Sequence, residues 1–367
     1  PCSVIVVVGN HANAPQTQQY PYLATLLTTA AQTRGYVAFV TVEGQPTVFD
    51  GAGAIVGSDA PTQRVRDEEN AAWVNGLLEL YATQIVATTP ESDPLEALRL
   101  ANRALASAPA GERHIVVVDS GLATVGPLSF TQEDMIYAWP NDVAGYLEYI
   151  EALVSLDGVS IDWFGMGDVA APQAPLTNRQ RNSLRDIWAA IITRGGGSVT
   201  FHDDAPGTAV IAGLPLVSTV DLEPDPLPQL IEADAPVFFD EGTLHFVPNE
   251  AVFLDPDEAR AILRPYARLL AQNPALQVHL VGTTATFWGD SNTDAAYELS
   301  QARAQAVCDL LVELGAPRGQ METEGQAYFD RWHLEEFDAS GNYLPNIATQ
   351  NRKVVLVEAH SDHDCVL

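Results

Sequence analysis

Four side chains that could bind a ligand follow two apolar strands of this sequence. His11 and Asn13 come just after the β-branched run 4–8, and Asp119 and Ser120 end a second apolar run. Ligands of open α/β sheets bind in the crevice outside the carboxyl ends of the strands. We therefore expect these side chains to meet in one crevice. An alternative role for His11 and Asn13 is to cap the loop and helix that follow them.

Catalysis by this set is not expected. His11, Asp119 and Ser120 are the residue types of a hydrolase triad, but Ser120 directly follows Asp119, so its side chain is expected to point away from that carboxylate. The sequence has no GxSxG elbow, P-loop, HExxH helix or GxGxxG fingerprint, each of which places a reactive or phosphate-binding group by its spacing. We expect a protein that is not an enzyme and that carries no cofactor.

The first 220 residues alternate short apolar strands with amphipathic helices. The expected strands are 4–8, 36–42, 114–119, 159–165 and 198–202, and the expected helices are 20–34, 62–85, 94–106, 143–156 and 178–194. Strands separated by helices are joined by parallel crossovers. Residues 1–220 are therefore expected to form an α/β domain with a doubly wound parallel sheet.

A second domain is expected after an acidic, proline-rich segment. Residues 221–236 contain four prolines and no periodicity, which is typical of a stiff linker. From 237 to 358 the pattern predicts a βαβαββ unit with a mixed sheet covered by helices, and residues 359–367 form a short tail.

The second domain resembles the OmpA-like domain, the peptidoglycan-binding module of envelope lipoproteins and flagellar motor stators. The resemblance covers residues 237–358 and rests on the order of FFDEGTLHF…LDPDEARAILRPYARLL, VHLVGTT, ELSQARAQAVCDLLVELGAP, METEGQA and NRKVVLV. It implies that Arg303, in the LSxxRA motif, binds a carboxylate of diaminopimelate in the peptide stem, with Arg352 near the same pocket. A guanidinium suits this task because its fixed fork binds a carboxylate through two hydrogen bonds.

One motif of this family is altered. The family sequence GHTD reads GTTA here, so Thr284 remains but Ala285 replaces the Asp that pairs with the ammonium group of the stem peptide. Asp290 and Asp294 in the same loop are either substitutes for that carboxylate or solvated surface. Residues 326–350 are rich in aromatic side chains, which stack on sugars, cover a pocket or pack onto their own domain.

The first domain resembles the von Willebrand factor A-like family. In that family a DxSxS loop, a Thr and an Asp from three loops hold Mg²⁺ through oxygen ligands. Here the first loop reads GNHAN from Gly9, the second places Thr89 or Ser92 near the Thr position, and the third matches the Asp with Asp119. The resemblance thus implies a degenerate site that holds no metal, although its side chains still lie in the crevice.

The amino-acid composition limits the classes of molecule that the chain can bind. The chain has 367 residues with 18 Lys+Arg and 48 Asp+Glu, a net charge of −30, which repels phosphate backbones and excludes nucleic acid as a partner. Cys2, Cys308 and Cys365 lack zinc-site spacing, but Cys2 and Cys365 could form a bridge in an oxidising compartment. The start at Pro1 leaves room for an export signal or a membrane anchor upstream of residue 1.

Together these features predict a secreted bacterial protein at the extracellular face of the cell envelope. The OmpA-like domain would bind peptidoglycan or a related cell wall ligand, and the N-terminal domain would contact other envelope proteins. Two alternatives remain open: a structural or assembly protein with degenerate ligand sites in both domains, and a metal-dependent adhesin.

Overall fold

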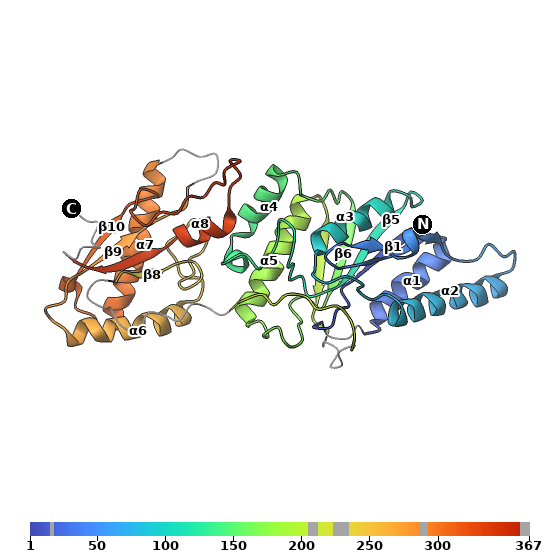
Figure 1. The fold of residues 1–367 in the computed structure, drawn as a ribbon, viewed down its shortest axis with the longest axis horizontal. Helices are drawn as coiled ribbons and strands as arrows, with labels where there is room; N and C mark the ends of the chain where they lie inside the picture. Colours follow the sequence, from blue (N-terminus) through green and yellow to red (C-terminus); the bar gives the residue numbers. More distant parts are fainter. Residues whose placement is uncertain (15–17, 205–211, 223–234, 287–292, 360–367) are drawn as a thin grey trace. The chain divides into compact units, whose positions relative to one another are not determined.

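The computed structural model describes residues 1–14, 18–204, 212–222, 235–286 and 293–359 (Figure 1). Contacts divide the chain into two compact units: Pro1–Ile136 with Pro140–Leu222, and Tyr137–Trp139 with Glu223–Leu367. Most of the expected linker, 221–236, lies outside the described residues, as does the tail from residue 360 onward.

The first unit is built on a seven-stranded sheet of order β3-β2-β1-β5-β6-β7, with β4 also paired to β2. The strands are β1 (Cys2–Val8), β2 (Tyr36–Thr41), β3 (Thr47–Val48), β4 (Ala54–Ile55), β5 (Glu112–Val118), β6 (Val159–Phe164) and β7 (Ser198–His202). All pairs are parallel except those of β3 and β4 with β2. Every residue of β1 is buried, because this β-branched strand is central and covered on both faces. The two short antiparallel strands were not predicted, since two-residue pairings leave no periodicity in the sequence.

Helices cover this sheet unevenly. They are α1 (Pro21–Thr33), α2 (Gln63–Thr83), α3 (Pro94–Leu105), α4 (Pro140–Tyr149) and α5 (Asn178–Arg194), with 3-10 turns at Phe49–Gly51 and Met135–Tyr137. Side chains of α1 and α2 pack in one cluster with Val4, Val6 and Val8 of β1. Right-handed crossovers place α3, α4 and α5 on the opposite face, because the chain moves across the sheet in the opposite direction after β2. The amino-terminal halves of β5, β6 and β7 are therefore left without a covering helix on the α1 face, within the described part of the unit.

One expected helix has different bounds. The segment predicted as helix 143–156 forms α4, which begins at Pro140 and ends at Tyr149. Proline fits the first turn of a helix, so the start is earlier than the apolar pattern indicated. Glu151 has a φ of 59°, which ends the right-handed helical conformation soon after Tyr149.

The second unit has a four-stranded sheet of order β10-β9-β11-β8. Its strands are β8 (Val237–Phe239), β9 (Val278–Gly282), β10 (Met321–Gly325) and β11 (Val354–Glu358), and its helices are α6 (Pro256–Gln272), α7 (Thr293–Glu313) and α8 (Pro345–Asn351), with a 3-10 turn at Arg318–Gln320. β9 and β10 are parallel, whereas β11 is antiparallel to both β9 and β8. The apolar faces of α6 and α7 pack on this sheet around Leu263 and Leu311.

The order of elements in this unit is βαβαβαβ rather than the predicted βαβαββ. The additional helix, α8, has seven residues and lies just before β11. Two turns of helix are too short to leave a clear apolar period in the sequence.

The structure also bears on the expected bridge between Cys2 and Cys365 and on the presence of membrane-spanning helices. Cys2 and Cys308 are buried free thiols, and Cys365, the proposed partner of Cys2 in a bridge, lies outside the described residues. In the part of the chain that the structure describes, no helix combines the length and apolar character that crossing a bilayer requires.

Candidate functional sites

A crevice opens at the carboxyl ends of β1 and β5 in the first unit. All five side chains expected there line it: His11, Asn13, Ser92, Asp119 and Ser120. They come together because neighbouring parallel strands end at the same edge of the sheet. The cavity volume is about 30 Å³, which has room for one or two water molecules. The crevice therefore suits a single small polar group.

Asp119 occupies the space that the first metal-binding carboxylate of the resembled family would need. Its Oδ1 accepts a hydrogen bond from the backbone N–H of Gly121 at 2.7 Å. A Cβ on Gly9 would lie 1.7 Å from Asp119 Oδ2. Only glycine fits at position 9 while Asp119 keeps this conformation. Burial raises the pKa of the Asp119 carboxyl to about 6, and hydrogen bonds from backbone N–H groups only partly oppose this rise.

His11 and Ser92 bring unpaired polar atoms to the crevice. His11 Nε2 and Ser92 Oγ are buried and have no hydrogen-bond partner in the described part of the chain. Burial lowers the pKa of His11 to about 4, although contacts with Glu91 and Glu43 oppose the shift. The imidazole is therefore neutral at pH 7. An unpaired buried polar atom costs about 1–3 kcal/mol, so a ligand that pairs with these two atoms would recover that free energy.

Asn13 has a structural role beside the crevice. Its Nδ2 donates to the carbonyl of Val217 at 3.0 Å, and its Oδ1 accepts from the N–H of Val217 at 3.1 Å. The nitrogen and the oxygen of the Asn13 side-chain amide thus both hold the segment that lines the far side of the crevice. These contacts are with a segment 204 positions along the chain, and not with the loop and helix that follow Asn13.

Two carboxylates near the crevice, a buried one and a half-buried one, were missed by the sequence analysis. Glu43 follows β2 and accepts hydrogen bonds from the N–H and hydroxyl groups of Thr88 and Thr89. Burial opposes its ionisation, but these hydrogen bonds together hold its pKa below the ordinary value. Glu91 accepts from the hydroxyl of Ser218 at 2.6 Å. The position of Glu43 at the end of a parallel strand was a signal that could have identified it.

These residues do not fit the Mg²⁺ ion that the complete loop set of the von Willebrand A-like family holds. Mg²⁺ prefers oxygen ligands in an octahedral arrangement. The first loop offers glycine at position 9 and the imidazole of His11, and Asp119 Oδ2 fills the room where another carboxylate would lie. The crevice therefore does not offer the ligand set of a magnesium site.

In the second unit, the expected ligand-binding arginine of α7 is buried. Arg303 is 1% exposed. Its Nε donates to the carbonyl of Glu250 at 3.1 Å, and its Cζ lies 4.9 Å from the centre of the Phe246 ring. Its Nη2 has no hydrogen-bond partner among the described residues. The protein thus pairs the Nε of this guanidinium and leaves its Nη2 without an acceptor.

A buried carboxylate of the same unit attracts both expected arginines. Glu241 is 2% exposed. Burial raises its pKa, and the attraction of Arg303 and Arg352 opposes that rise. Arg352 is also buried; its Nη2 donates to the Tyr343 hydroxyl at 3.4 Å, and its Cζ lies 3.6 Å from the centre of the Trp139 ring, which belongs to this unit. Sequence reasoning missed Glu241, because nothing in the FFDEGT segment indicates that this side chain turns inward.

The remaining residues of this predicted site are dispersed. Thr284 is buried and its N–H donates to the carbonyl of Ala327 at 2.7 Å. Asp294 is exposed in the first turn of α7, and Asp290 lies outside the described residues. Ala285, at the position of the family Asp, packs with Tyr343 in a small apolar cluster. A carboxylate there would lose its hydration, so the loss of Asp agrees with the packing.

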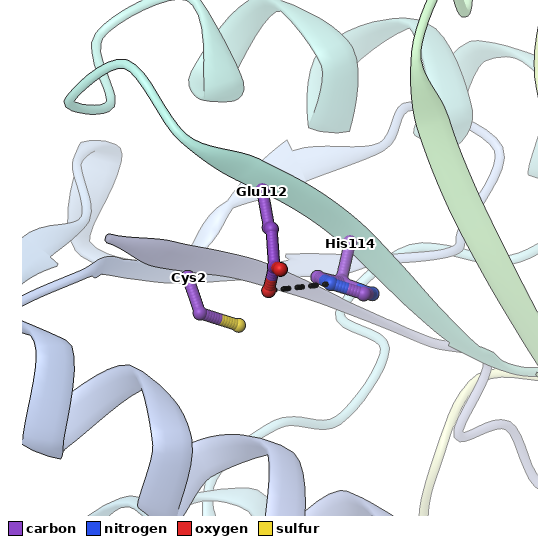
Figure 2. Close-up of side chains that lie close together, drawn as sticks. All are labelled: Cys2, Glu112 and His114. Atoms are coloured by element: carbon purple, nitrogen blue, oxygen red, sulfur yellow. Dashed lines mark ion pairs between the residues drawn. The ribbon is translucent and has the colours of Figure 1, made fainter.

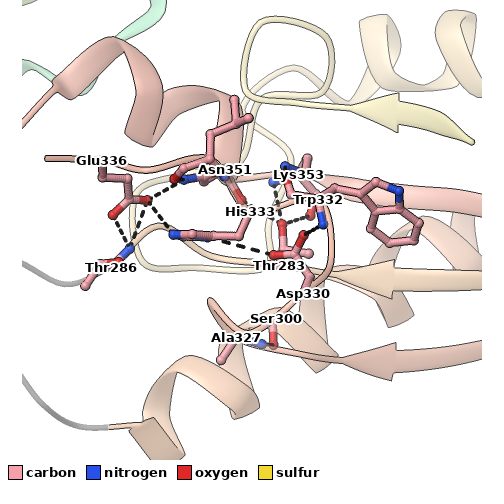
Figure 3. A network of polar contacts seen from close by, with 11 residues as sticks. Thr283, Thr286, Ser300, Ala327, Asp330, Trp332, His333, Glu336, Asn351 and Lys353 are labelled. Carbon is pink, nitrogen blue, oxygen red and sulfur yellow. Dashed lines mark hydrogen bonds and ion pairs between the residues drawn. The ribbon is translucent and has the colours of Figure 1, made fainter. Parts of the chain in front are cut away.

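Buried polar contacts fix the long segment between β10 and α8, as Figure 3 shows. The Glu336 carboxylate accepts from the N–H of Thr286 at 2.8 Å and from Asn351 Nδ2 at 2.8 Å. Lys353 Nζ donates to the carbonyl of Trp332 at 2.9 Å, and its pKa is lowered by burial although Asp330 and other acids oppose the shift. The segment is therefore held on its own unit by polar contacts. Of its aromatic side chains Tyr343 is buried, whereas Phe329 and Phe337 are exposed.

Comparison with known proteins identifies the class of this unit. Residues 245–331 match the model of the OmpA family. The second unit of the chain is therefore an OmpA-like domain, with Arg303 inside the matched range. Among curated proteins, none matches the chain.

Several solved structures are similar to part of the chain. The OmpA-like domain of FopA1 from Francisella tularensis subsp. tularensis SCHU S4 is 20% identical, with a TM-score of 0.27, and the match covers 36% of this chain and 80% of that one. The peptidoglycan-associated lipoprotein from Burkholderia pseudomallei is 24% identical, with a TM-score of 0.26 and coverage of 31% and 87%. The cell wall anchor of the T6SS from Pseudomonas aeruginosa is 24% identical, with a TM-score of 0.26 and coverage of 34% and 81%.

Proposed function

We propose that this protein is a non-enzymatic component of the bacterial cell envelope whose OmpA-like unit binds peptidoglycan or a related wall ligand. The observation that carries the proposal is Arg303, which lies within the family match and has an unpaired Nη2. A buried guanidinium gains most from a carboxylate acceptor, because the alternative is an unsatisfied charged donor. The carboxylates of a peptidoglycan stem peptide have the required chemistry.

Glu241 would regulate access to this arginine. It supplies an internal carboxylate that attracts both Arg303 and Arg352, so a wall ligand has to compete with it. Removal of the Glu241 charge should therefore strengthen binding of a carboxylate ligand.

The first unit would mediate protein contacts through its crevice. The small volume and the unpaired His11 Nε2 and Ser92 Oγ favour a single polar side chain of a partner over a whole small molecule. The absence of known catalytic spacings supports a non-enzymatic role. We place the protein at the extracellular face of the envelope, where its acidic surface would favour solubility.

A sedimentation assay with purified peptidoglycan sacculi tests this function. We expect wild-type protein to cosediment, Arg303→Ala to lose at least about tenfold in binding, and Arg303→Lys to recover little, because lysine lacks the planar fork. Glu241→Gln should bind more tightly than wild type. Arg260→Ala is the matched control, since Arg260 forms exposed ion pairs on α6 of the same unit.

Thermal unfolding by circular dichroism separates loss of binding from loss of folding. If wild-type protein does not cosediment, or if folded Arg303→Ala binds as well as wild type, the proposal is wrong. The first of these outcomes would favour the second candidate, a structural or assembly protein with degenerate sites. The apolar packing of Ala285 supports that candidate.

A further inference from the structure

Three metal-ligating side chains meet at the amino-terminal ends of β1 and β5, at the end of the sheet opposite the crevice (Figure 2). Cys2 and Glu112 are direct partners across the two parallel strands, and His114 lies two pairs further along, opposite Val4. Alternate residues of a strand point to the same face, so all three side chains share one face of the sheet. A ligand atom of each lies within 4.8 Å of those of the other two.

The three side chains are available for a ligand. Cys2 is a free thiol. Glu112 is exposed, and its Oε2 lies 3.9 Å from His114 Nε2, too far for a hydrogen bond. His114 Nδ1 is buried and has no hydrogen-bond partner among the described residues. The cluster therefore contains donors and acceptors that the rest of the first unit does not satisfy.

Solvent reaches this cluster because no described helix covers this part of the α1 face. Exposed or half-buried polar side chains continue across the neighbouring strands at Ser160 of β6 and at Ser198 and Thr200 of β7. A cation can thus approach from the side of Glu112, while the Cys2 thiol lies against the apolar core.

The ligand set indicates which metal fits. Sulfur and imidazole nitrogen favour Zn²⁺ and similar transition metals over Mg²⁺ or Ca²⁺, which prefer oxygen. Tetrahedral Zn²⁺ with bonds of about 2.0–2.3 Å places its ligand atoms about 3.5 Å apart. The present separations of up to 4.8 Å require a shift of about 1 Å, which rotation of the exposed Glu112 side chain together with small rotations of Cys2 and His114 can provide. Three protein ligands leave a fourth position for water.

We propose that Cys2, Glu112 and His114 form a binding site for a Zn²⁺-class transition metal on the open face of the first unit. The site is separate from the crevice and from the OmpA-like unit, so it does not depend on the proposed function.

Titration of the full chain with Co²⁺ and Zn²⁺ under reducing conditions tests this site. We expect one Co²⁺ to bind with a thiolate-to-metal charge-transfer band and with the strong visible bands of four-coordinate Co²⁺, and Zn²⁺ to displace it. Cys2→Ser should remove the charge-transfer band. His114→Gln should weaken Zn²⁺ affinity, measured by calorimetry, by at least about tenfold. Glu112→Gln should have a smaller effect.

Two matched controls identify the thiolate and the imidazole. Cys308→Ser replaces the buried cysteine of the second unit, and His202→Gln replaces a histidine of β7 that already contacts Asp162. Both variants should bind as wild type does. A combined variant of the tail, His360→Gln, His363→Gln and Cys365→Ser, should also keep the band.

The site is refuted if wild type gives no charge-transfer band, or if the band survives in Cys2→Ser or disappears in the tail variant. His114→Gln keeps the proposal testable if Cys2→Ser does not fold. Unchanged Zn²⁺ affinity in folded His114→Gln would also overturn it.

Discussion

Replacement of Asp119 by Asn should make the stability of the first unit much less dependent on pH. The Asp119 carboxyl is 7% exposed, and the chief cause of its raised pKa is burial. Asn has the same shape and retains an oxygen that can accept from the N–H of Gly121, so the substitution removes the charge with little change in packing.

The size of the effect follows from the shift in pKa. The Asp119 pKa is about 6 in the folded unit, against an ordinary value of 3.8. Because the folded state binds the proton more strongly, stability is highest when the group is protonated, and it falls as pH rises from about 4 through 6. At 1.36 kcal/mol per pKa unit, the ionised group costs about 3 kcal/mol at pH 7.5 and less than about 1 kcal/mol at pH 4. The Asn amide adds a constant cost of about 1 kcal/mol for its buried N–H groups.

Asp119→Asn should therefore be about 2 kcal/mol more stable than wild type at pH 7.5, with this advantage gone near pH 4. Hydrogen exchange of β1 and β5, compared between the two proteins at each pH, measures the free energy of opening without interference from the second unit. The ratio of their opening constants should change about 60-fold over this pH range. Asp59→Asn, which removes an exposed carboxylate of the same unit, should show little change. If the ratio for Asp119→Asn does not vary with pH, the assignment of the buried charge is wrong.

Two further substitutions probe the packing of each unit. Gly9→Ala should destabilise the first unit by about 1–3 kcal/mol in chemical denaturation, because its Cβ would overlap the Asp119 carboxylate; the loss should be smaller when Asp119 is also replaced by Gly. Glu336→Ala should accelerate tryptic cleavage of the segment after β10, because it removes the acceptor of the Thr286 N–H, a hydrogen bond to a charged group that contributes about 1.5–3 kcal/mol.

Neighbouring residues supply controls for both. Gly76→Ala introduces a Cβ that meets nothing within 4 Å, so it should not destabilise the first unit. Glu335→Ala removes an exposed carboxylate of the same segment and should leave cleavage unchanged. Equal effects of the paired substitutions would mean that the contacts of Gly9 and Glu336 are not the cause.

The crevice was predictable because the ends of the strands can be recognised from local sequence patterns. The β-branched run of β1 and the helix that follows it indicate a parallel crossover, and the residues after β1 and β5 must then share an edge of the sheet. His11 and Asp119 were found in this way. The conformation of Asp119 was not, because it depends on the absence of a Cβ at Gly9 on the neighbouring strand.

In the OmpA-like unit, the sequence identified the arginines but not their surroundings. The LSxxRA motif led to Arg303, and the family match at residues 245–331 confirms the class of domain. The burial of Arg303 beside Glu241 could not be predicted, because Glu241 lies about 60 positions away and has no motif of its own. The helix α8 was missed since seven residues give too little periodicity.

The sequence by itself determined the number and type of the main elements, the acidic surface and the residue types available for chemistry. Only the tertiary structure decided which of those residues meet. Cys2 lies 110 positions from Glu112, and cysteine spacing alone gave no metal site, yet parallel pairing of β1 with β5 puts both on one face beside His114. The physical reason is the register of the strands, because hydrogen bonding between strands fixes which residues lie opposite each other. The sequence indicates where the strands lie but not how they pair.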